Sequence, residues 1–462
     1  MKRRSIVGPL ILILIGTVFL INNLRPELPL ADMVAVYWPY LLIGWGVLRL
    51  AEVLWSFSRG DRVLPSMSGG EVVLVVLIAL LGTGLFSAHR HGIRFGMRGL
   101  EMFGEPYDFS VSVQKTLPEA PARIVVENLR GNVKVTGGAA QEIRVTGRKS
   151  IRALSRPEAA RADQRTPVEI VAQGGSWVIR TNQDRLDNSE RISDDLEIAA
   201  PAQAMLEVHA RSGDYDISDV AGVQIRAERG DVRLNRIAGN ARVEVRRSDL
   251  VRAVDVTGNV DLQGRGSDVE LVSIKGQASV NGAFSGTLDF RNIAKPLHFE
   301  SQNTDLRVEA VPGQLSMDLG EFSGRDLTGP IRLITKSKDV RIHDFTQSLE
   351  LETERGDIEL TLARTPVPKI DARSRTGKID LTLPARSAFQ LQASTEHGDA
   401  INEFGPPIEK ETDGRAAALK GSAGQGPAIR LTTERGTVSV RKAGQGMKQA
   451  DLVPKPEASG PM

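Results

Sequence analysis

Aspartates recur along this sequence at a regular spacing, and a row of carboxylates is the first feature that could do chemistry. They stand in short corner motifs about 18 residues apart or at multiples of that spacing: Asp214, Asp231, Asp249, Asp268, Asp305, Asp339 and Asp357. A Ca²⁺ ion takes about six to eight oxygen ligands, whereas each corner offers one carboxylate. Calcium-binding β-rolls also repeat a Gly-Gly-x-Gly-x-Asp motif at about half this period. The pattern therefore favours turn residues over metal ligands.

The tripeptide Arg-Gly-Asp, which is associated with cell adhesion, occurs at three places. These are Arg59-Gly60-Asp61, Arg229-Gly230-Asp231 and Arg355-Gly356-Asp357. The second and third coincide with corners of the repeat, where Arg, Gly and Asp are all common. We therefore interpret the tripeptides as a coincidence of turn composition.

Other residue types that often form sites are scattered. The six histidines are His89, His91, His209, His298, His343 and His397, and only the first two are close in sequence. The chain has no cysteine, which excludes thiolate catalysis, disulfides and Cys-ligated zinc. The glycine-rich stretch Gly421–Gly426 lacks the Gly-Lys-Ser/Thr of a phosphate-binding loop.

Glycan cleavage needs two carboxylates in a groove, about 5 to 10 Å apart. Acidic residues at every repeat would form such pairs by accident, and most corners are too short to build a cleft. We predict that the protein is not an enzyme and has no catalytic, cofactor-binding or metal-binding residues and no cofactor.

The elements that carry the corners are short alternating stretches, and Val223–Gly239 is the clearest copy. Val223 and Ile225 alternate with polar residues before the Gly230-Asp231 corner, and Val232 and Leu234 alternate after it. An alternation with period two puts these four apolar side chains on one face of two short strands. Each unit is thus predicted to be two strands around a tight turn.

The unit recurs many times. The first inward residues are predicted to be Leu206, Val223, Ala241, Val260, Ala278, Leu297, Leu315, Ile331, Leu349, Ile370 and Phe389. The inward residues after the corners are predicted to be Val232, Leu250, Val269, Leu288, Leu306, Val340, Ile358 and Ile379. So short a unit cannot bury its apolar face alone, so neighbours must stack. The predicted fold is all-β: a single-stranded β-solenoid of short coils of about 18–19 residues.

Composition argues against nucleic acid as a partner. The 462 residues include 59 Lys and Arg against 57 Asp and Glu, and aromatic residues make up 5%. A near-neutral chain offers no general attraction to phosphates. Few aromatic rings are available for base stacking.

Three apolar segments, Ile6–Ile21, Met33–Leu48 and Val72–Ala88, begin the chain. With flanking residues they predict a three-helix transmembrane anchor over residues 1–88, so the lipid bilayer is a predicted partner. A cleavable signal peptide is the alternative for the first segment, but Phe19–Asn23 lacks a small-x-small cleavage site.

Basic residues predict the orientation. Lys2, Arg3 and Arg4 favour a cytoplasmic N-terminus, although the basic stretch after residue 88 competes with this. Three crossings then put the solenoid outside the bacterial cytoplasmic (inner) membrane, in a multi-pass protein.

The remaining boundaries follow from composition. Residues 89–105 are predicted to be a juxtamembrane linker, 106–441 the solenoid, and 442–462 a disordered tail. Within the solenoid, 405–428 is predicted to be an inserted loop, followed by a last strand pair that closes the end. We also predict a short helix over 150–164 and a polar loop or cap over 182–195.

Two stretches resemble known bacterial families. Residues 5–55, with Gly8-Pro9 and Trp38-Pro39-Tyr40, resemble the LiaF/LiaI-type transmembrane region of cell-envelope-stress proteins. The repeats from about residue 122 onward, with Asn128–Gly137 and the later Arg-Gly-Asp corners, resemble the bacterial "putative adhesin" domain, a β-solenoid family. Neither family implies catalytic residues.

We expect a non-enzymatic, membrane-anchored protein of the cell envelope. Its extracytoplasmic solenoid would serve as a surface for binding, adhesion or sensing, with an envelope protein or a glycan as partner. One alternative is a membrane regulator of an envelope-stress two-component system. The other is a polysaccharide-binding or polysaccharide-active β-helix.

Overall fold

The computed structural model describes residues 104–118, 123–186 and 192–444, together with five single positions before them. The chain divides into two compact units: Met1–Asp108 with Ser150–Gln164, and Phe109–Lys149 with the rest. Most of one helix, α4 (Arg156–Arg165), belongs to the first unit, where the Glu158 carboxylate accepts a hydrogen bond from the backbone N–H of Leu154 at 3.1 Å. A helix was predicted over 150–164, but it begins later because residues up to Ala153 belong to a strand, β4 (Glu142–Ala153).

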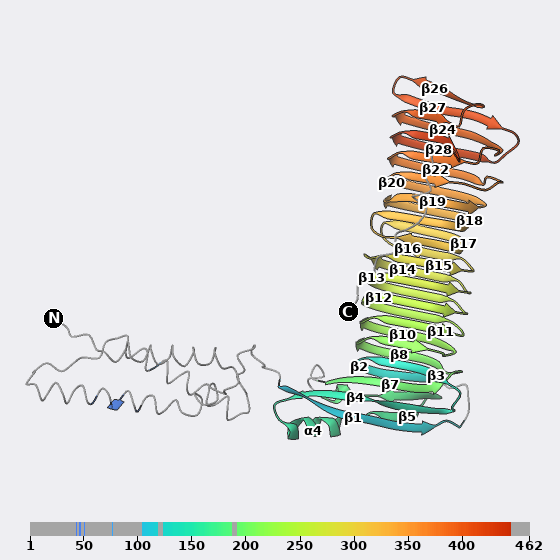
Figure 1. Cartoon of the computed structure of the whole chain (residues 1–462). Coiled ribbons are helices and arrows are strands. Elements are labelled where there is room, and N and C mark those ends of the chain that lie inside the picture. Colours follow the sequence, from blue (N-terminus) through green and yellow to red (C-terminus); the bar gives the residue numbers. More distant parts are fainter. Residues whose placement is uncertain are drawn as a thin grey trace, which may run out of the picture. The chain divides into compact units, whose positions relative to one another are not determined.

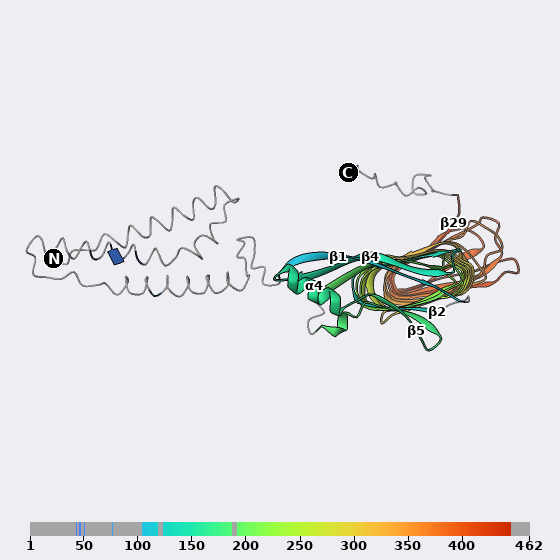
Figure 2. The ribbon, with the colours of Figure 1, turned by 90° about the horizontal axis from the view of Figure 1, so that it is seen from below.

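The second unit is a stack of flattened coils (Figure 1). Each coil gives one strand to each of two sheets, which we name face A and face B. Viewed nearly along the stack, successive coils overlie one another as an oval (Figure 2). Face A begins with β8 (Met205–Ser212), β10 (Gly222–Arg229) and β14 (Ala278–Phe284), and face B with β9 (Tyr215–Ser218), β11 (Val232–Ile237) and β15 (Leu288–Ile293). β12 (Ala241–Val256) and β13 (Val260–Ile274) cross both faces.

Parallel pairing in register holds these coils together. On face A, each of the following residues stands beside the next: Leu206, Val223, Ala241, Val260, Ala278 and Leu297. On face B the corresponding row is Tyr215, Val232, Val251, Val269 and Leu288. All of these side chains are buried in one continuous core between the faces. The prediction that Leu250 faces inward is wrong. The register shifts between Val245 and Ser248, so Val251 faces inward instead.

The winding is interrupted by one antiparallel coil. After β16 (Leu297–Glu300) the chain turns back, and β17 (Thr304–Met317) runs antiparallel to β16 on face A and to β15 on face B. A second reversal leads into β18 (Glu321–Ser337), which is antiparallel to β17. Leu315 was predicted to be the first inward residue of a unit and Leu306 an inward residue after a corner. Both are buried as predicted, but Leu306 lies on face A and Leu315 on face B, the reverse of the predicted order.

Parallel coils resume after the reversal. They are formed by β19 (Asp339–Thr346), β20 (Ser348–Arg355), β21 (Ile358–Thr361), β22 (Lys369–Thr376) and β23 (Ile379–Leu383). Face A holds β20 and β22, and face B holds β19, β21 and β23.

The far end departs from sequence order. The last strand pair, β28 (Ala428–Arg435) and β29 (Val438–Lys442), does not close the stack as predicted. It is inserted between the β22/β23 coil and the coil of β24 (Phe389–His397) and β25 (Ala400–Glu403). Residues 405–428 are not a loop, because most of them form the hairpin of β26 (Ile408–Asp413) and β27 (Ala416–Ala423), which extends face A beyond β24 (Figure 1).

A similar insertion occurs near the start. β2 (Arg123–Arg130) and β3 (Val133–Gly138) pair in parallel with β8 and β9, although about 80 residues separate them in sequence. Next to them lie β6 (Ser176–Arg180), which forms a hairpin with β5 (Glu169–Gln173), and β7 (Ile192–Pro201). The chain also contains β1 (Glu105–Thr116), which pairs with β4 (Glu142–Ala153). The predicted loop over 182–195 is partly wrong, since β7 begins at Ile192 and buries it.

The fold prediction was wrong in its N-terminal part. Across the described ranges and single positions the structure is β-rich, and no helix there is both long and apolar enough to cross a membrane. The predicted three-helix transmembrane anchor is therefore not supported. Apart from four single positions, the three apolar segments lie outside the described residues, as do most of the predicted linker and most of the predicted tail.

Candidate functional site

Most of the recurring aspartates bind the backbone of the neighbouring coil. Asp214 Oδ1 accepts a hydrogen bond from the N–H of Asp231 at 3.1 Å, and Asp231 Oδ1 accepts one from the N–H of Asp249 at 3.2 Å. After the reversal, Asp339 Oδ1 accepts from the N–H of Asp357 at 2.9 Å, and Asp357 Oδ1 from that of Lys378 at 2.9 Å. Each carboxylate thus satisfies an N–H that the parallel ladder leaves open at the corner.

These hydrogen bonds give the aspartates a structural role at the corners. We predicted turn residues, and the structure shows in addition that these side chains join one coil to the next. Asparagines do the same at the opposite corner, where Asn240 Oδ1 accepts from Asn259 N–H and Asn259 Oδ1 from Gln277 N–H, both at 2.9 Å. Across the described part of the chain, no group of three or more His, Asp or Glu side chains is arranged to hold a metal ion.

Glycine is required beside the aspartates. Gly230 has φ +127°, and a Cβ there would lie 1.7 Å from the carbonyl oxygen of Gly213 in the preceding coil. Gly356 has φ +135°, and its Cβ would lie 2.0 Å from the carbonyl oxygen of Lys338. Both glycines belong to Arg-Gly-Asp tripeptides, so the Gly and Asp of these tripeptides have structural roles at the corners.

The outward side chains of face A form two columns that run from coil to coil. Parallel register aligns Glu207, Gln224, Arg242, Asp261, Ser279 and His298 in one column. The same register aligns His209, Arg226, Glu244, Gln263, Asn281 and Glu300 in the other. Neighbouring members of a column are about 4.8 Å apart, the spacing of paired strands.

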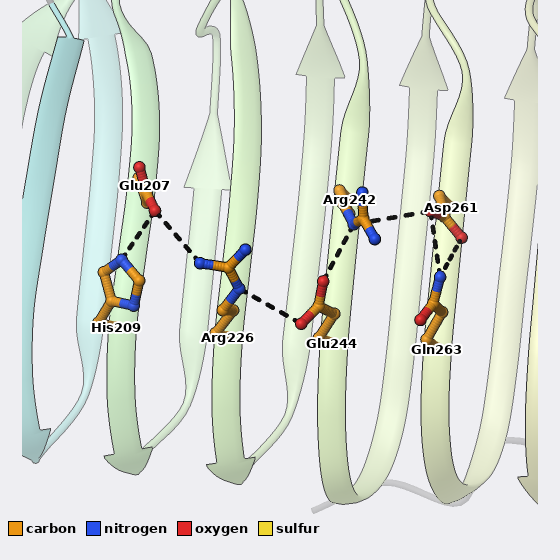
Figure 3. A network of polar contacts seen from close by, with 7 residues as sticks. All are labelled: Glu207, His209, Arg226, Arg242, Glu244, Asp261 and Gln263. Atoms are coloured by element: carbon orange, nitrogen blue, oxygen red, sulfur yellow. Dashed lines mark hydrogen bonds and ion pairs between the residues drawn. The ribbon is translucent and has the colours of Figure 1, made fainter.

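Ion pairs and hydrogen bonds link the columns (Figure 3). Arg226 contacts Glu207 at 3.5 Å and Glu244 at 3.3 Å, joining three successive coils. Arg242 then contacts Glu244 at 3.0 Å and Asp261 at 3.7 Å. The result is a chain of alternating charges across face A, in which each side chain is held by its neighbours.

Glu207 is the most enclosed carboxylate of this network, with a side chain only 12% exposed. It accepts hydrogen bonds from Arg123 of β2 and from His209 Nε2, the latter at 2.8 Å. The hydrogen bond from Arg123 holds the pKa of the Glu207 carboxyl below its ordinary value, and His209 acts in the same direction against the opposing effect of burial. Glu207 therefore ties the inserted β2 to the main run of coils.

A hollow of about 380 Å³ lies on face A where the winding reverses. It is lined by Gln277, Pro296, Leu297, His298, Arg307, Val308, Glu309 and Pro330. A second hollow, of about 560 Å³, lies among β3, β4 and β7, and its charged lining is mixed: Lys134, Arg148, Asp195, Glu197, Asp214 and Asp216. Both are shallow depressions rather than enclosed cavities.

Sequence reasoning proposed no site residues, and it did not find the hollow at the reversal. His298 and His343 lie on different faces, in β16 and β19, so the structure does not bring them together. His89 and His91 lie outside the described residues. The reversal could have been suspected from the missing corner between Asp305 and Asp339, but its direction depends on pairing that no local pattern shows.

The similarity of the chain to solved structures is weak. One similar structure is that of a putative cell adhesion protein from Clostridium sporogenes, with 7% sequence identity and a TM-score of 0.17. The alignment covers 73% of this chain and 100% of the other. Another is a putative adhesin from Bacteroides fragilis, with 11% identity and a TM-score of 0.18, covering 72% and 97%. Scores this low carry no argument about what this chain binds. No curated protein matches the sequence.

The family comparison is extensive. The Toastrack DUF4097 profile matches residues 122–441, from the start of β2 almost to the end of β29. This range contains both runs of parallel coils, the reversal between them and the hairpin at the far end. The chain therefore belongs to the Toastrack DUF4097 family.

Proposed function

We propose that the stack of coils is a non-enzymatic adhesion or binding surface of the bacterial cell envelope. It lies on the outer side of the cytoplasmic membrane and recognises an envelope protein or a glycan. The observation that supports this most directly is the pair of polar columns on face A, which continue without a break through six successive coils.

The columns are suited to recognition because their side chains are held in place before a partner arrives. Parallel pairing sets the position of the backbone in each coil. The ion pairs of Arg226 and Arg242 restrain the outward side chains of the two columns. A surface that is ordered in advance loses less conformational entropy on binding. Short polar side chains such as Ser279 and the exposed Asn281 leave room for a partner's own groups between the charged coils.

The proposal predicts that a bulky charge in the middle of face A will weaken binding. Labelled full-length protein is titrated onto isolated bacterial envelope fractions, and the Asn281→Arg variant is compared with wild type. We expect a loss of affinity of about tenfold or more, the scale of a disrupted interface contact. Asn235→Arg on face B is the matched control and should bind as wild type does.

Equal binding by wild type and Asn281→Arg would contradict the use of face A. Weakening of equal size by the face B control would point to a general charge effect instead. The proposal also states that the protein does not cleave its partner. Release of reducing ends from envelope glycans by the purified protein would overturn that statement.

A further inference from the structure

Where the chain reverses, the strand pairing on face A changes from parallel to antiparallel. His298 of β16 stands directly opposite Arg307 of the antiparallel β17, where every earlier coil is followed by a parallel one. The hollow of about 380 Å³ opens where the pairing changes. Its volume lies within the range of small-ligand sites, about 300–1,000 Å³.

The lining combines apolar and polar groups. The exposed rings of Pro296 and Pro330 supply apolar surface, while Arg307, Gln277 and Glu309 supply donors and acceptors. This mixture matches a sugar, whose C–H faces pack on apolar rings and whose hydroxyl groups both donate and accept hydrogen bonds.

Asp305 positions the two nitrogen-bearing side chains of the hollow. Its Oδ1 lies 3.5 Å from Arg307 Nε and 3.5 Å from His298 Nε2. His298 Nε2 and Asp305 Oδ1 are both buried atoms that lack a hydrogen-bond partner. Because these two atoms are covered and Asp305 does not line the hollow, Asp305 acts by orienting His298 and Arg307, which do line it.

The charges around the hollow disfavour a simple anion. Arg307 is accompanied by the carboxylates of Asp305, Glu309 and Glu300, the last of which lies 3.9 Å from His298 Nε2. We propose that this hollow binds one or two rings of a neutral saccharide. The inference rests on the proposed binding function and adds to it both the ligand class and the place.

The test measures saccharide binding by the full-length protein. The probes are maltotriose, cellotriose and triacetylchitotriose, with sodium glucuronate as the anionic comparison, and binding is followed by saturation-transfer NMR and calorimetry. At least one neutral trisaccharide should bind, and His298→Ala and Arg307→Ala should each weaken it about tenfold or more. Arg430→Ala is the matched control, because Arg430 is 57% exposed and Arg307 58%, and both lie on face A.

Failure of all three neutral probes to bind wild type would overturn the proposal. So would binding that is unchanged by both His298→Ala and Arg307→Ala, or glucuronate binding tighter than any neutral probe. If the saccharide test fails while Asn281→Arg still loses envelope binding, the proposed function stands and only the site and ligand class are wrong.

Discussion

The two runs of parallel coils, before and after the reversal, use different side chains at the same place. On face A, the position just before the corner holds Ala227 and Val245 in the first run, and register aligns Gly264 and Gly282 with them. In the second run, register aligns buried hydroxyl residues at this position: Thr335, Thr353, Ser374, Thr433 and Thr395.

The hydroxyl groups of the second run link coils through the corner carbonyls. Ser374 Oγ donates to Gly356 O at 3.2 Å, Thr433 Oγ1 to Gly377 O at 3.0 Å, and Thr395 Oγ1 to Gly436 O at 2.8 Å. In the first run the aligned residues Ala227, Val245, Gly264 and Gly282 carry no hydroxyl group, so no side chain there makes this hydrogen bond. One fold position is thus stabilised in two ways, while the glycine of the corner is common to both runs.

The glycines should show the largest effect, and an equal one in both runs. A Cβ at Gly377, where φ is +150°, would lie 2.1 Å from Gly356 O, and one at Gly230 would lie 1.7 Å from Gly213 O. We expect Gly377→Ala and Gly230→Ala each to cost about 3–5 kcal/mol of unfolding free energy in denaturant titrations. Gly138→Ala, where nothing lies within 4 Å, is the control. A mild effect in only one run would show that its coils can separate at the corner.

Exchanging the apolar and hydroxyl side chains between the two runs should lower the unfolding free energy by less than the glycine substitutions do. Thr433→Val removes a buried hydroxyl that binds Gly377 O, and Val245→Thr puts a hydroxyl among apolar neighbours. Each should lower the unfolding free energy by about 1–3 kcal/mol, the cost of an unpaired buried polar group. Thermal melting of the two single variants provides the measurement. If Val245→Thr were neutral, the difference between the runs would have no energetic meaning.

The smallest expected change in stability is that of replacing Glu207, which lies in the first run of coils. Its folded pKa is lowered mainly by the hydrogen bond from Arg123, so its contribution is present above the unfolded pKa and is lost as pH falls through the folded one. Glu207→Gln should therefore lower stability by about 1 kcal/mol near neutral pH, and the difference from wild type should shrink in acid below the ordinary value of 4.5.

Glu350→Gln is the comparison for this pH series. Glu350 lies on face A after the reversal, with a side chain 65% exposed and 3.8 Å from Arg332. So exposed a pair contributes little, and the variant should melt as wild type does at every pH. A difference that grew in acid for Glu207→Gln would contradict the assigned direction of its pKa.

The local pattern of apolar residues predicted the coils correctly where coils that are neighbours in space are also consecutive in sequence. The row from Leu206 to Leu297 was predicted residue by residue, because period-two alternation and a corner glycine are properties of a single unit. Leu250 was misplaced by one residue, since an extra residue in β12 changes which side chain faces inward and alternation alone does not reveal it.

Pairing between distant segments could not be read in the same way. The strands of β28 and β29 were located, yet their place between β22/β23 and β24/β25 was not, because every coil presents much the same edge to its neighbours. The hairpin of β26 and β27 was taken for a loop, since its exposed charged residues carry little apolar pattern and β27 is stabilised by pairing with β24.

The repeating unit could be predicted from its own residues: alternating apolar residues that turn inward, glycine at the corner and a short side chain beside it. Pairing between units sets which coil each Asp or Asn bonds, where the winding reverses, and that His298, Asp305 and Arg307 meet there. The physical reason is that a unit's own composition sets its shape, whereas its neighbours are chosen by backbone hydrogen bonds that are nearly identical for every coil.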